Sequence, residues 1–530
     1  MNKVEKFKKE KDSLEIKNDL ARFAQEGWES ISEDDVQRLK WYGLFLRKPT
    51  PGYFMLRVRI PNGLTYSHQV KTLADIADTY GNGVIDITTR QQVQLRHLRI
   101  ENILMVFEMM DAVGLTSLQT GMDNVRNIMG CPVAGLQSTE VLNGFPLVAA
   151  LNQHILENRE FTNLPRKFNM AVTGCPHNCI EAETQDLALV PARKVIDGEE
   201  VTGFNILAGG KLGSGGYRIA TPLDIFVRSE DAVEVCDAII RLYRDYGDRE
   251  TRTANRFAFL VEEWGEERVR AEVVKLLKRP LQTAGEDARE IKKNDHVGIF
   301  RQKQPGMNYV GLKVVTGRIT GKSFREAGEL AERYGNGDIR LTPSQNLVLP
   351  HVSDKKLGDL LEEPLLKELL YAPFGMTRHL VSCVGSDYCS MATIETKSRA
   401  VQVSRELEKK LDDATPLSIH WSGCPAGCGN HLVADVGLLG KKARVKGKVV
   451  DAVDIYVGGR TGPNPALATR IMENVPCDDL ADVLKHVVPY HTREKMHPVR
   501  RKRKPRSVRL PDEEEPPGNI RVIPVAMGSA

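Results

Sequence analysis

Several features that define common protein classes are scarce in this chain of 530 residues. Aromatic residues make up only 6% of it, and no apolar run approaches the roughly 20 residues that cross a membrane as a helix. Nine cysteines are too few for a disulfide scaffold at this length, and an odd number suits a reducing compartment. The first twenty residues mix both charge signs without an apolar core, which predicts neither a secretion signal nor a transit peptide. We therefore expect a cytoplasmic protein with no membrane span.

The chain also lacks a strong net charge, because 74 basic residues against 70 acidic ones leave +4. The exception is a basic cluster at Arg500–Arg506, followed by an acidic, proline-rich segment. Such a run can bind nucleic acid or an acidic protein, although it is more often a solvated, disordered tail. A nucleic-acid-binding protein is therefore one alternative. The remaining composition, 41% hydrophobic and 27% charged, is typical of a globular protein of two to four domains.

Four cysteines form the pattern C-x5-C followed by C-x3-C, which we call the cysteine frame: Cys383, Cys389, Cys424 and Cys428. Two short pairs separated by one helix-like segment can deliver four thiolates to a metal centre. Zinc sites usually have only about two to four residues within each pair, whereas a [4Fe–4S] cube is wider and also takes four thiolates. The spacing favours the cluster, and glycines beside the second pair would let the backbone approach it. The alternative is a set of buried free cysteines.

A long repeat runs through the chain. The order strand, turn, helix, YGNG and strand occurs twice, with an offset of 254 residues between Tyr80 and Tyr334 (334 minus 80). In the first copy we expect strands at 53–61 and 84–98 and a helix at 70–83.

The second part of the unit repeats as well. TGCPHNC around Cys175 matches SGCPAGC around Cys424, with an offset of 249 (424 minus 175). Such a period is far too long for a solenoid. It predicts a duplicated α/β module, packed about a pseudo-two-fold axis with a ligand between the halves.

The two copies differ in their chemistry. The second copy has both cysteine pairs, whereas the first keeps a set of cations: Arg57, Arg59, Arg90, Arg96, Arg126, Arg166 and Lys167. At matching places the second copy is neutral or apolar, for instance Ser344 against Arg90. Guanidinium groups on strands and loops usually bind carboxylates or small oxyanions, although solvated arginines paired with surface acids are the alternative. A cluster that faces a cationic pocket indicates multi-electron reduction of a small anion, with a carboxylate-rich tetrapyrrole as second cofactor.

Taken together, the cysteine frame and the motifs GYFMLRVRIPNG, TTRQ, NVRN and LPRKFN resemble the sirohaem-containing nitrite and sulfite reductase family over about 40–490. The resemblance implies an α/β (α+β) fold in a three-domain sirohaem reductase architecture, built from an internally duplicated module with pseudo-two-fold symmetry. The implied parts are an N-terminal helical segment at 1–45, a shared domain of ferredoxin-like halves at 46–118 and 300–362, a sirohaem-binding α/β domain at 119–299, a second α/β domain with the cluster at 363–490, and a flexible tail at 491–530.

The resemblance also implies roles for single residues. Cys383, Cys389, Cys424 and Cys428 would bind the [4Fe–4S] cluster, and the sulfur of Cys428 would also be the axial ligand of the sirohaem iron. Basic side chains would bind the anion and supply protons: Arg57, Arg90, Arg126, Arg166 and Lys167. Further cofactor contacts would come from Gln94, Arg96 and Asn430.

Two choices remain within the family. Sulfite reductases usually carry a second lysine where this chain has Asn169, so we expect six-electron reduction of nitrite, with sulfite as the alternative substrate. No G-x-G-x-x-G fingerprint lies in a βαβ unit, the nearest run being GGKLGSGG at 209–216. Electrons would therefore come from a separate ferredoxin, and we expect a monomer. Cys175 and Cys179 are interpreted as packing residues left from the duplication or, less favoured, as part of a second cluster; the role of Cys131 stays open.

Overall fold

The computed structural model describes residues 2–213, 215–291, 293–373, 375–411, 417–496 and 521–522. The basic cluster Arg500–Arg506 therefore lies outside the described residues. The chain divides into two compact units, Met1–Ala372 with Thr461–Pro463 (unit 1) and Pro373–Arg460 with Asn464–Ala530 (unit 2). Within the described part of the chain, no helix is long and apolar enough to span a membrane.

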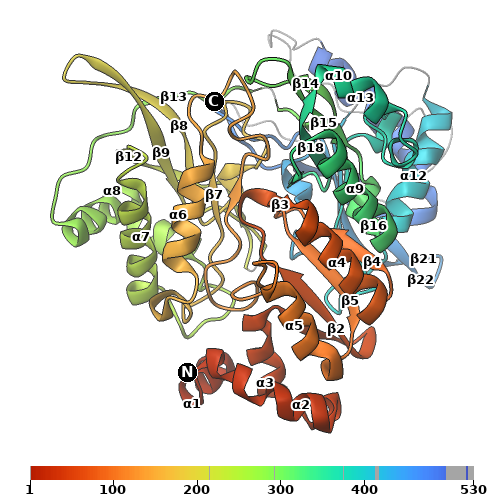
Figure 1. The fold of residues 1–530 in the computed structure, drawn as a ribbon, viewed down its shortest axis with the longest axis horizontal. Helices are drawn as coiled ribbons and strands as arrows, with labels where there is room; N and C mark the ends of the chain where they lie inside the picture. Colours follow the sequence, from red (N-terminus) through yellow and green to blue (C-terminus); the bar gives the residue numbers. More distant parts are fainter. Residues whose placement is uncertain are drawn as a thin grey trace. The chain divides into compact units, whose positions relative to one another are not determined.

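Unit 1 begins with three short helices, drawn in red in Figure 1: α1 (Lys3–Glu10), α2 (Leu20–Glu26) and α3 (Glu33–Arg38). The Asn2 side chain caps α1 by accepting hydrogen bonds from two backbone N–H groups, and the Ser32 hydroxyl caps α3 by accepting one, from Asp35. Apolar side chains on these helices, such as Phe23, are buried in the same hydrophobic core as the apolar side chains of the two sheets that follow.

Two five-stranded sheets follow, one from each copy of the repeat. The first consists of β1 (Leu44–Arg47), β2 (Thr50–Val58), β5 (Val93–Leu98), β4 (Val84–Ile87) and β16 (Arg318–Thr320). The second consists of β14 (Gly298–Arg301), β15 (Met307–Leu312), β18 (Leu347–Ser353), β17 (Asp338–Leu341) and β3 (Leu64–Tyr66). Each sheet thus takes its last strand from the other copy.

The helices of the two copies are related by the same pseudo-two-fold symmetry as the sheets. Helix α4 (Ser67–Tyr80) packs against its counterpart α9 (Gly321–Tyr334), as Figure 1 shows. Gln91 and Gln345, 254 residues apart, both adopt left-handed backbone with φ of 56° and 65°. Gln91 Nε2 donates to the carbonyl oxygen of Leu341 at 3.0 Å, and Gln345 Nε2 donates to that of Ile87, also at 3.0 Å. These reciprocal bonds confirm the predicted duplication and its pseudo-two-fold symmetry.

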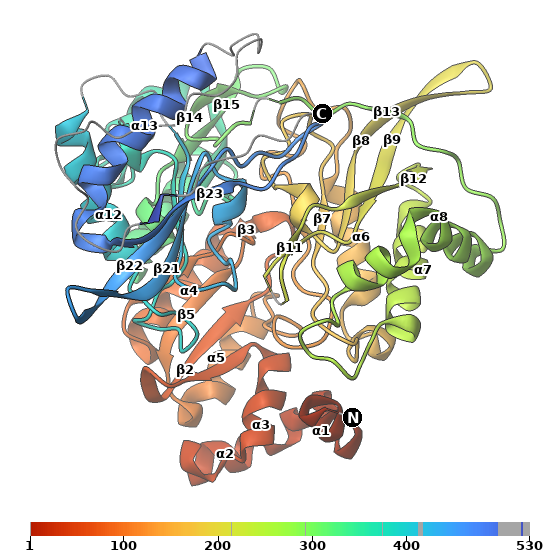
Figure 2. The same ribbon diagram turned by 180° about the vertical axis from the view of Figure 1, so that it is seen from behind.

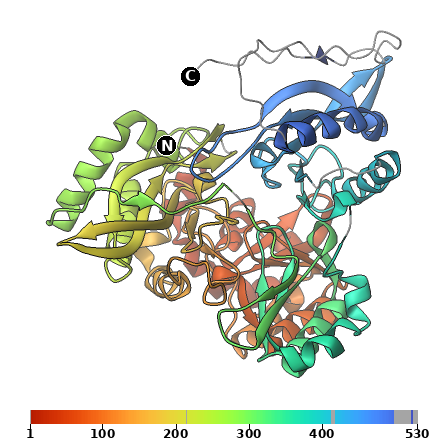
Figure 3. The same cartoon turned by 90° about the horizontal axis from the view of Figure 1, so that it is seen from above.

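The rest of unit 1 is an α/β layer with its own core. Its sheet runs β12 (Thr221–Val227), β9 (Glu199–Ala208), β8 (Leu187–Ile196), β7 (Met170–Val172) and β6 (Met129–Gly130), with the short β13 (Glu286–Asp287) beside β8. Strands β6, β7 and β8 are parallel, and β8, β9 and β12 are antiparallel. Helices α7 (Ala232–Tyr246) and α8 (Phe257–Leu277) pack side by side, with α8 against β12 (Figures 2 and 3).

Unit 2 repeats this plan around a third core. Its sheet runs β19 (Leu380–Ser382), β20 (Ile419–Ser422), β21 (Val436–Val445), β22 (Lys448–Val457), β23 (Thr469–Pro476) and β24 (Arg521–Val522). Strands β21 and β22 lie 249 residues after β8 and β9 and have the same lengths. Helices α12 (Lys397–Lys410) and α13 (Leu480–Met496) contact each other. The strand order and the parallel-to-antiparallel switch are therefore the same in both copies.

Candidate functional site

The TTRQ motif lies on a turn between β4 and β5, so the prediction of one continuous strand over 84–98 was wrong. The Thr88 hydroxyl accepts from the backbone N–H of Arg90 at 3.3 Å, and Gln91 is left-handed. These local hydrogen bonds compete with strand pairing and close a hairpin. The turn presents the Arg90 guanidinium, which donates to Gln185 Oε1 at 2.9 Å and to the carbonyl oxygen of Asn127 at 3.2 Å.

Three of the predicted cations converge on one loop. Arg57 extends from β2 and its Nη1 donates to the carbonyl oxygen of Thr120 at 3.0 Å. The Nη1 of Arg126 donates to the same oxygen at 2.6 Å, so the two guanidinium groups are neighbours. Arg90 is held at Asn127, the next residue along. Like charges this close favour an anion between or beside them.

Arg166 joins this group through a second loop. The backbone N–H of Arg126 donates to Phe168 at 2.9 Å, and the N–H of Phe168 donates to Asn124 at 3.1 Å, which holds the two loops side by side. Arg166 Nη1 lies 3.6 Å from Asp123 Oδ1, and Arg166 Nε is buried with no hydrogen-bond partner among the described residues. We call Arg57, Arg90, Arg126 and Arg166 the cation cluster. Lys167 and Asn169, both half-buried, follow on the segment that leads into β7.

The acids beside the cation cluster are already neutralised. Asp123 accepts two hydrogen bonds from Arg252, at 2.6 and 2.8 Å, and Asp186 accepts two from Arg256, at 2.9 and 2.6 Å. Burial and the neighbouring guanidinium groups hold the pKa of Arg126 well below its usual value. The arginines therefore raise the cost of one another's charge in a poorly solvated site, and a bound anion would lower that cost.

Sequence reasoning missed Lys40, which lies on the 3-10 helix Leu39–Tyr42. Burial, followed by the charges of Arg47, Arg126 and Arg166, lowers the pKa of Lys40 to about 8. An added Cβ at Gly121 would lie 2.0 Å from the carbonyl oxygen of Lys40, so only glycine lets this helix approach the NVRN loop. That glycine, two residues before Asp123 in GMDNVRN, is the signal that sequence reading could have used.

Arg59 positions the loop rather than facing a ligand. It is 2% exposed, and its Nε donates to Asn152 Oδ1 at 2.7 Å. Its other nitrogens donate to the carbonyl oxygens of Val125 at 3.3 Å and Arg126 at 3.2 Å. Burial and the charge of Arg90 lower the pKa of Arg59 to about 9.

Gln94 and Arg96 lie on β5 in a buried network. Arg96 Nε donates to Asp86 Oδ2 at 2.9 Å, and Arg96 Nη2 donates to Gln94 Oε1 at 2.5 Å. Asp86 also accepts from Arg318 of the second repeat at 3.0 Å. These contacts bind the two copies together, and a cofactor contact of Gln94 or Arg96 stays a prediction.

In unit 2 the cysteine frame lies at the ends of two parallel strands. Cys383 follows β19, and Cys424 follows β20. Burial raises the pKa of both thiols, that of Cys424 to about 11, and the other cysteines of the frame add to the shift for Cys424. The four thiols are therefore near enough to affect one another's charge. Cys428 is the most exposed of them.

The backbone around the frame donates to its sulfur atoms. The N–H of Gly423 points at Cys383 Sγ, 3.1 Å away, and the N–H of Ala426 does the same for Cys424. A Cβ at Gly429 would lie 2.0 Å from the carbonyl oxygen of Trp421, so this turn requires glycine. Asn430 follows in left-handed backbone with φ of 56°. Amide donors to thiolate sulfur are a feature of iron–sulfur sites, so the frame fits a [4Fe–4S] cluster.

Two family models match the chain, each of them twice. The model described as "Nitrite and sulphite reductase 4Fe-4S domain" matches 121–281 and 375–506, and "Nitrite/Sulfite reductase ferredoxin-like half domain" matches 46–113 and 300–367. The chain belongs to the nitrite and sulfite reductase family. The two predicted cofactors, sirohaem and a [4Fe–4S] cluster, are those of this family.

Relatives of this family member align over nearly their whole length. It is 44% identical to a ferredoxin–nitrite reductase of Leptolyngbya laminosa, over 93% of this chain and 97% of the relative. It is 42% identical to a chloroplastic ferredoxin–nitrite reductase of Zea mays, over 91% and 88%. A solved structure of the Mycobacterium tuberculosis NirA protein matches with a TM-score of 0.88 at 28% identity, covering 95% of each chain. The predicted fold class is thereby confirmed.

Proposed function

We propose that this family member is an assimilatory ferredoxin-dependent nitrite reductase, an oxidoreductase that converts nitrite to ammonia. The observation that carries the proposal is the convergence of Arg57 and Arg126 on the carbonyl oxygen of Thr120, with Arg90 beside them. Relatives named ferredoxin–nitrite reductase align over more than nine-tenths of the chain, which supports nitrite as substrate and ferredoxin as electron donor.

We assign the predicted domain boundaries to this chain, and its buried cores support them. The N-terminal segment 1–45 and the paired halves 46–118 and 300–362 would share one core. The first α/β domain, 119–299, would have a second core, and the other, 363–490, a third. The proposed tail at 491–530 lies mostly outside the described residues.

Cys383, Cys389, Cys424 and Cys428 would hold the cluster, and Cys428 would also help to hold the sirohaem. When bound, these groups supply the electrons and the iron site of the reduction. Lys167 and the buried, unpartnered Nε of Arg166 suit the carboxylates of the tetrapyrrole or the substrate anion. Asn430, Gln94 and Arg96 are the remaining proposed cofactor contacts.

The cation cluster acts on the substrate. Arg57, Arg90 and Arg126 lower the cost of holding an anion in a poorly solvated site and stabilise the charge that develops as N–O bonds break. Lys40, with its pKa of about 8, holds a proton at neutral pH and can release it to a leaving oxygen. Asn169 adds no charge, which suits singly charged nitrite better than sulfite.

The remaining assignments concern partners and location. Electrons would come from reduced ferredoxin, which is a separate protein. The glycine-rich segment at 209–216 does not lead from a strand into a helix as a nucleotide-binding loop does, because its strand β10 (Lys211–Leu212) pairs with β11 (Tyr217–Arg218). None of the nine cysteines, all of them among the described residues, forms a disulfide, which suits the reducing cytoplasm. The enzyme acts as a monomer, without nucleic acid or membrane.

The test compares nitrite and sulfite turnover by the purified chain with reduced ferredoxin. We expect a sirohaem absorption spectrum and a higher kcat/KM for nitrite than for sulfite. A folded chain without colour or iron would contradict the proposed enzyme activity. A preference for sulfite would contradict the proposed substrate. Asn169→Lys should raise relative sulfite turnover on the order of tenfold, equivalent to about 1.4 kcal/mol. Gln153→Lys, at an exposed position on α6 (Phe145–Ile155), is the matched control.

A further inference from the structure

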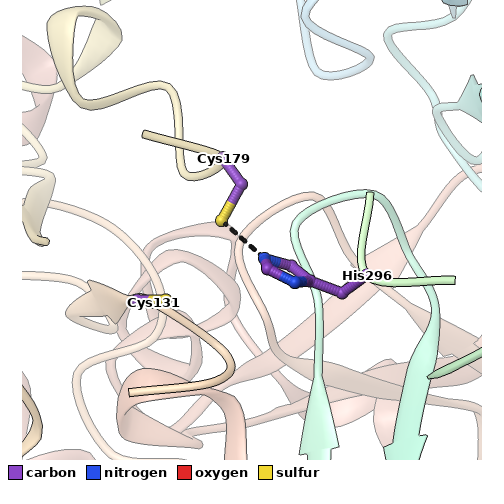
Figure 4. Close-up of side chains that lie close together, drawn as sticks. All are labelled: Cys131, Cys179 and His296. Atoms are coloured by element: carbon purple, nitrogen blue, oxygen red, sulfur yellow. Dashed lines mark hydrogen bonds between the residues drawn. The ribbon is translucent and has the colours of Figure 1, made fainter. Parts of the chain in front are cut away.

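A second group of sulfur ligands lies in unit 1, away from the cysteine frame in sequence. The Sγ atoms of Cys131 and Cys179 and a ring nitrogen of His296 all lie within 4.8 Å of one another (Figure 4). His296 Nε2 is 3.3 Å from Cys179 Sγ. Cys131 is 3% exposed, Cys179 8% and His296 1%. Three ligand-type side chains from three separate segments thus meet in the interior.

Cys175 adds a fourth donor to this group. It precedes Cys179 by four residues on the turn after β7, and its thiol is near enough to that of Cys131 for each to shift the pKa of the other. Cys175 Sγ also donates to Gln137 Oε1 at 3.1 Å and is 1% exposed. We call Cys131, Cys175, Cys179 and His296 the buried cysteine–histidine group.

We propose that the buried cysteine–histidine group binds one zinc ion as a closed, structural site. Three cysteines and one histidine are a usual tetrahedral zinc set, with Zn–S of about 2.3 Å and Zn–N of about 2.0 Å. A tetrahedron with those bonds separates its ligand atoms by about 3.5–3.8 Å. Three of the four ligand atoms, those of Cys131, Cys179 and His296, lie within 4.8 Å of one another, so small movements would close them on an ion. The Cys175 thiol lies outside that limit and would complete the set by turning toward the other three.

The imidazole is already oriented for this role. His296 Nδ1 lies 3.4 Å from the hydroxyl of Tyr309, which leaves Nε2 directed at Cys179. The Tyr309 hydroxyl is 3.5 Å from Gln137 Nε2, and Phe300 stacks on the Tyr309 ring with centroids 4.9 Å apart. Metal-binding histidines are typically fixed by such a partner on the other ring nitrogen.

A buried cation balances the charge of the site. Arg340 is 6% exposed, and Cys131 is among the groups whose charge acts on it. Its guanidinium donates to the carbonyl oxygens of Pro132 at 3.3 Å and Ala134 at 3.4 Å, directly after Cys131. Three thiolates and a divalent ion leave one negative charge, and Arg340, which also pairs with Asp338 at 3.5 Å, places a positive charge beside it.

The geometry favours a single ion over a second iron–sulfur cluster. A cube binds each thiolate at a different iron and needs wider spacing. Among the described residues, the group whose ligand atoms all lie within 4.8 Å is the one in unit 1, not the cysteine frame. Apolar side chains, which include Val133, Leu136 and Val348, pack beside the ligands, and none of the four ligand residues is more than 8% exposed, as suits a closed site.

Elemental analysis of the intact, cofactor-loaded protein tests the proposal. We expect one zinc ion per chain besides the iron, and zinc-edge X-ray absorption should give three sulfur ligands and one nitrogen. Cys131→Ala and His296→Asn should each lower zinc content at least about tenfold. Cys236→Ala, at an equally buried position in α7, is the matched control and should keep its zinc.

The absorption measurement needs no variant, so the proposal can be tested even if a substituted chain fails to fold. A protein without metal beyond the iron of its sirohaem and one cluster would overturn it. So would a disulfide among Cys131, Cys175 and Cys179 in mass spectra, or acid-labile sulfide in excess of one cluster. None of these results depends on the substrate, so the zinc site and the proposed function fail independently.

Discussion

The two C-x3-C turns of this chain have the same backbone but different surroundings. Asn178 in the first copy and Gly427 in the second both have positive φ, 45° and 68°. Glu181 and Asn430, also 249 residues apart, have φ of 53° and 56°. Both copies of the turn therefore place two thiols in the same way. The other ligands, which come from different segments of the chain, determine what each turn can bind.

Those partner residues differ sharply. In unit 2 the turn is joined by Cys383 and Cys389, which would give four thiolates for a cluster. In unit 1 it is joined by Cys131 and His296, which would give a set for one ion. A cluster moves electrons, whereas a closed zinc site is redox-inert and stabilises the fold. If both proposed sites hold, one copy of the duplicated turn serves electron transfer and the other serves the structure.

The largest expected effect comes from exchanging serine for the first cysteine of each turn. Cys424→Ser should lose the cluster's iron and acid-labile sulfide, and with them all nitrite turnover. Cys175→Ser should keep both and lose zinc instead. Iron, sulfide and zinc assays on the two proteins check this. If Cys175→Ser loses iron and acid-labile sulfide while its sirohaem spectrum is unchanged, the two turns do not have the separate roles proposed here.

The TTRQ turn offers a second exchange, because the second copy has Ser344 where the first has Arg90. Both turns close alike, with the N–H of Gln91 donating to Thr88 at 3.1 Å and that of Gln345 to Thr342 at 3.0 Å. Arg90→Ser should therefore fold normally. It should lower kcat/KM for nitrite by about 10²–10³-fold, the loss typical of one donor to developing charge.

Steady-state kinetics measure the effect of Arg90→Ser. Arg193→Ser is the control, since that arginine is exposed on β8 and pairs with Glu200 at 3.2 Å. If Arg90→Ser has the same kcat/KM for nitrite as the unmodified enzyme, Arg90 does not belong to the anion site.

Much of this comparison was predictable from sequence, because repeats and ligand spacing are local patterns. The offsets of 254 and 249 predicted the duplicated module, and the cysteine frame predicted the cluster. The single strand over 84–98 was wrong, since the Thr88 hydroxyl and left-handed Gln91 close a turn that β-propensity does not reveal.

Contacts between distant segments escaped sequence reading. His296 has no cysteine near it in the chain, and Lys40 lies in a charged helical region that reads as surface. Both reach their sites only through tertiary packing, and neither stands at a spacing that marks a site. Only the requirement for glycine at position 121 hinted at the approach of Lys40.

The smallest expected effect tests whether the first copy supplies protons as well as positive charge. The pKa of Lys40 is lowered to about 8, so its proton is present below that pH and lost above it. If Lys40 donates in the rate-limiting step, kcat for nitrite should fall about tenfold per pH unit above about 8. Lys40→Arg keeps the charge but cannot release a proton in this range, so it should have lower kcat and no such alkaline limb. A pH profile of Lys40→Arg that matches the unmodified enzyme would assign the proton to Lys167 or to water, leaving Lys40 to add positive charge beside Arg126 and Arg166.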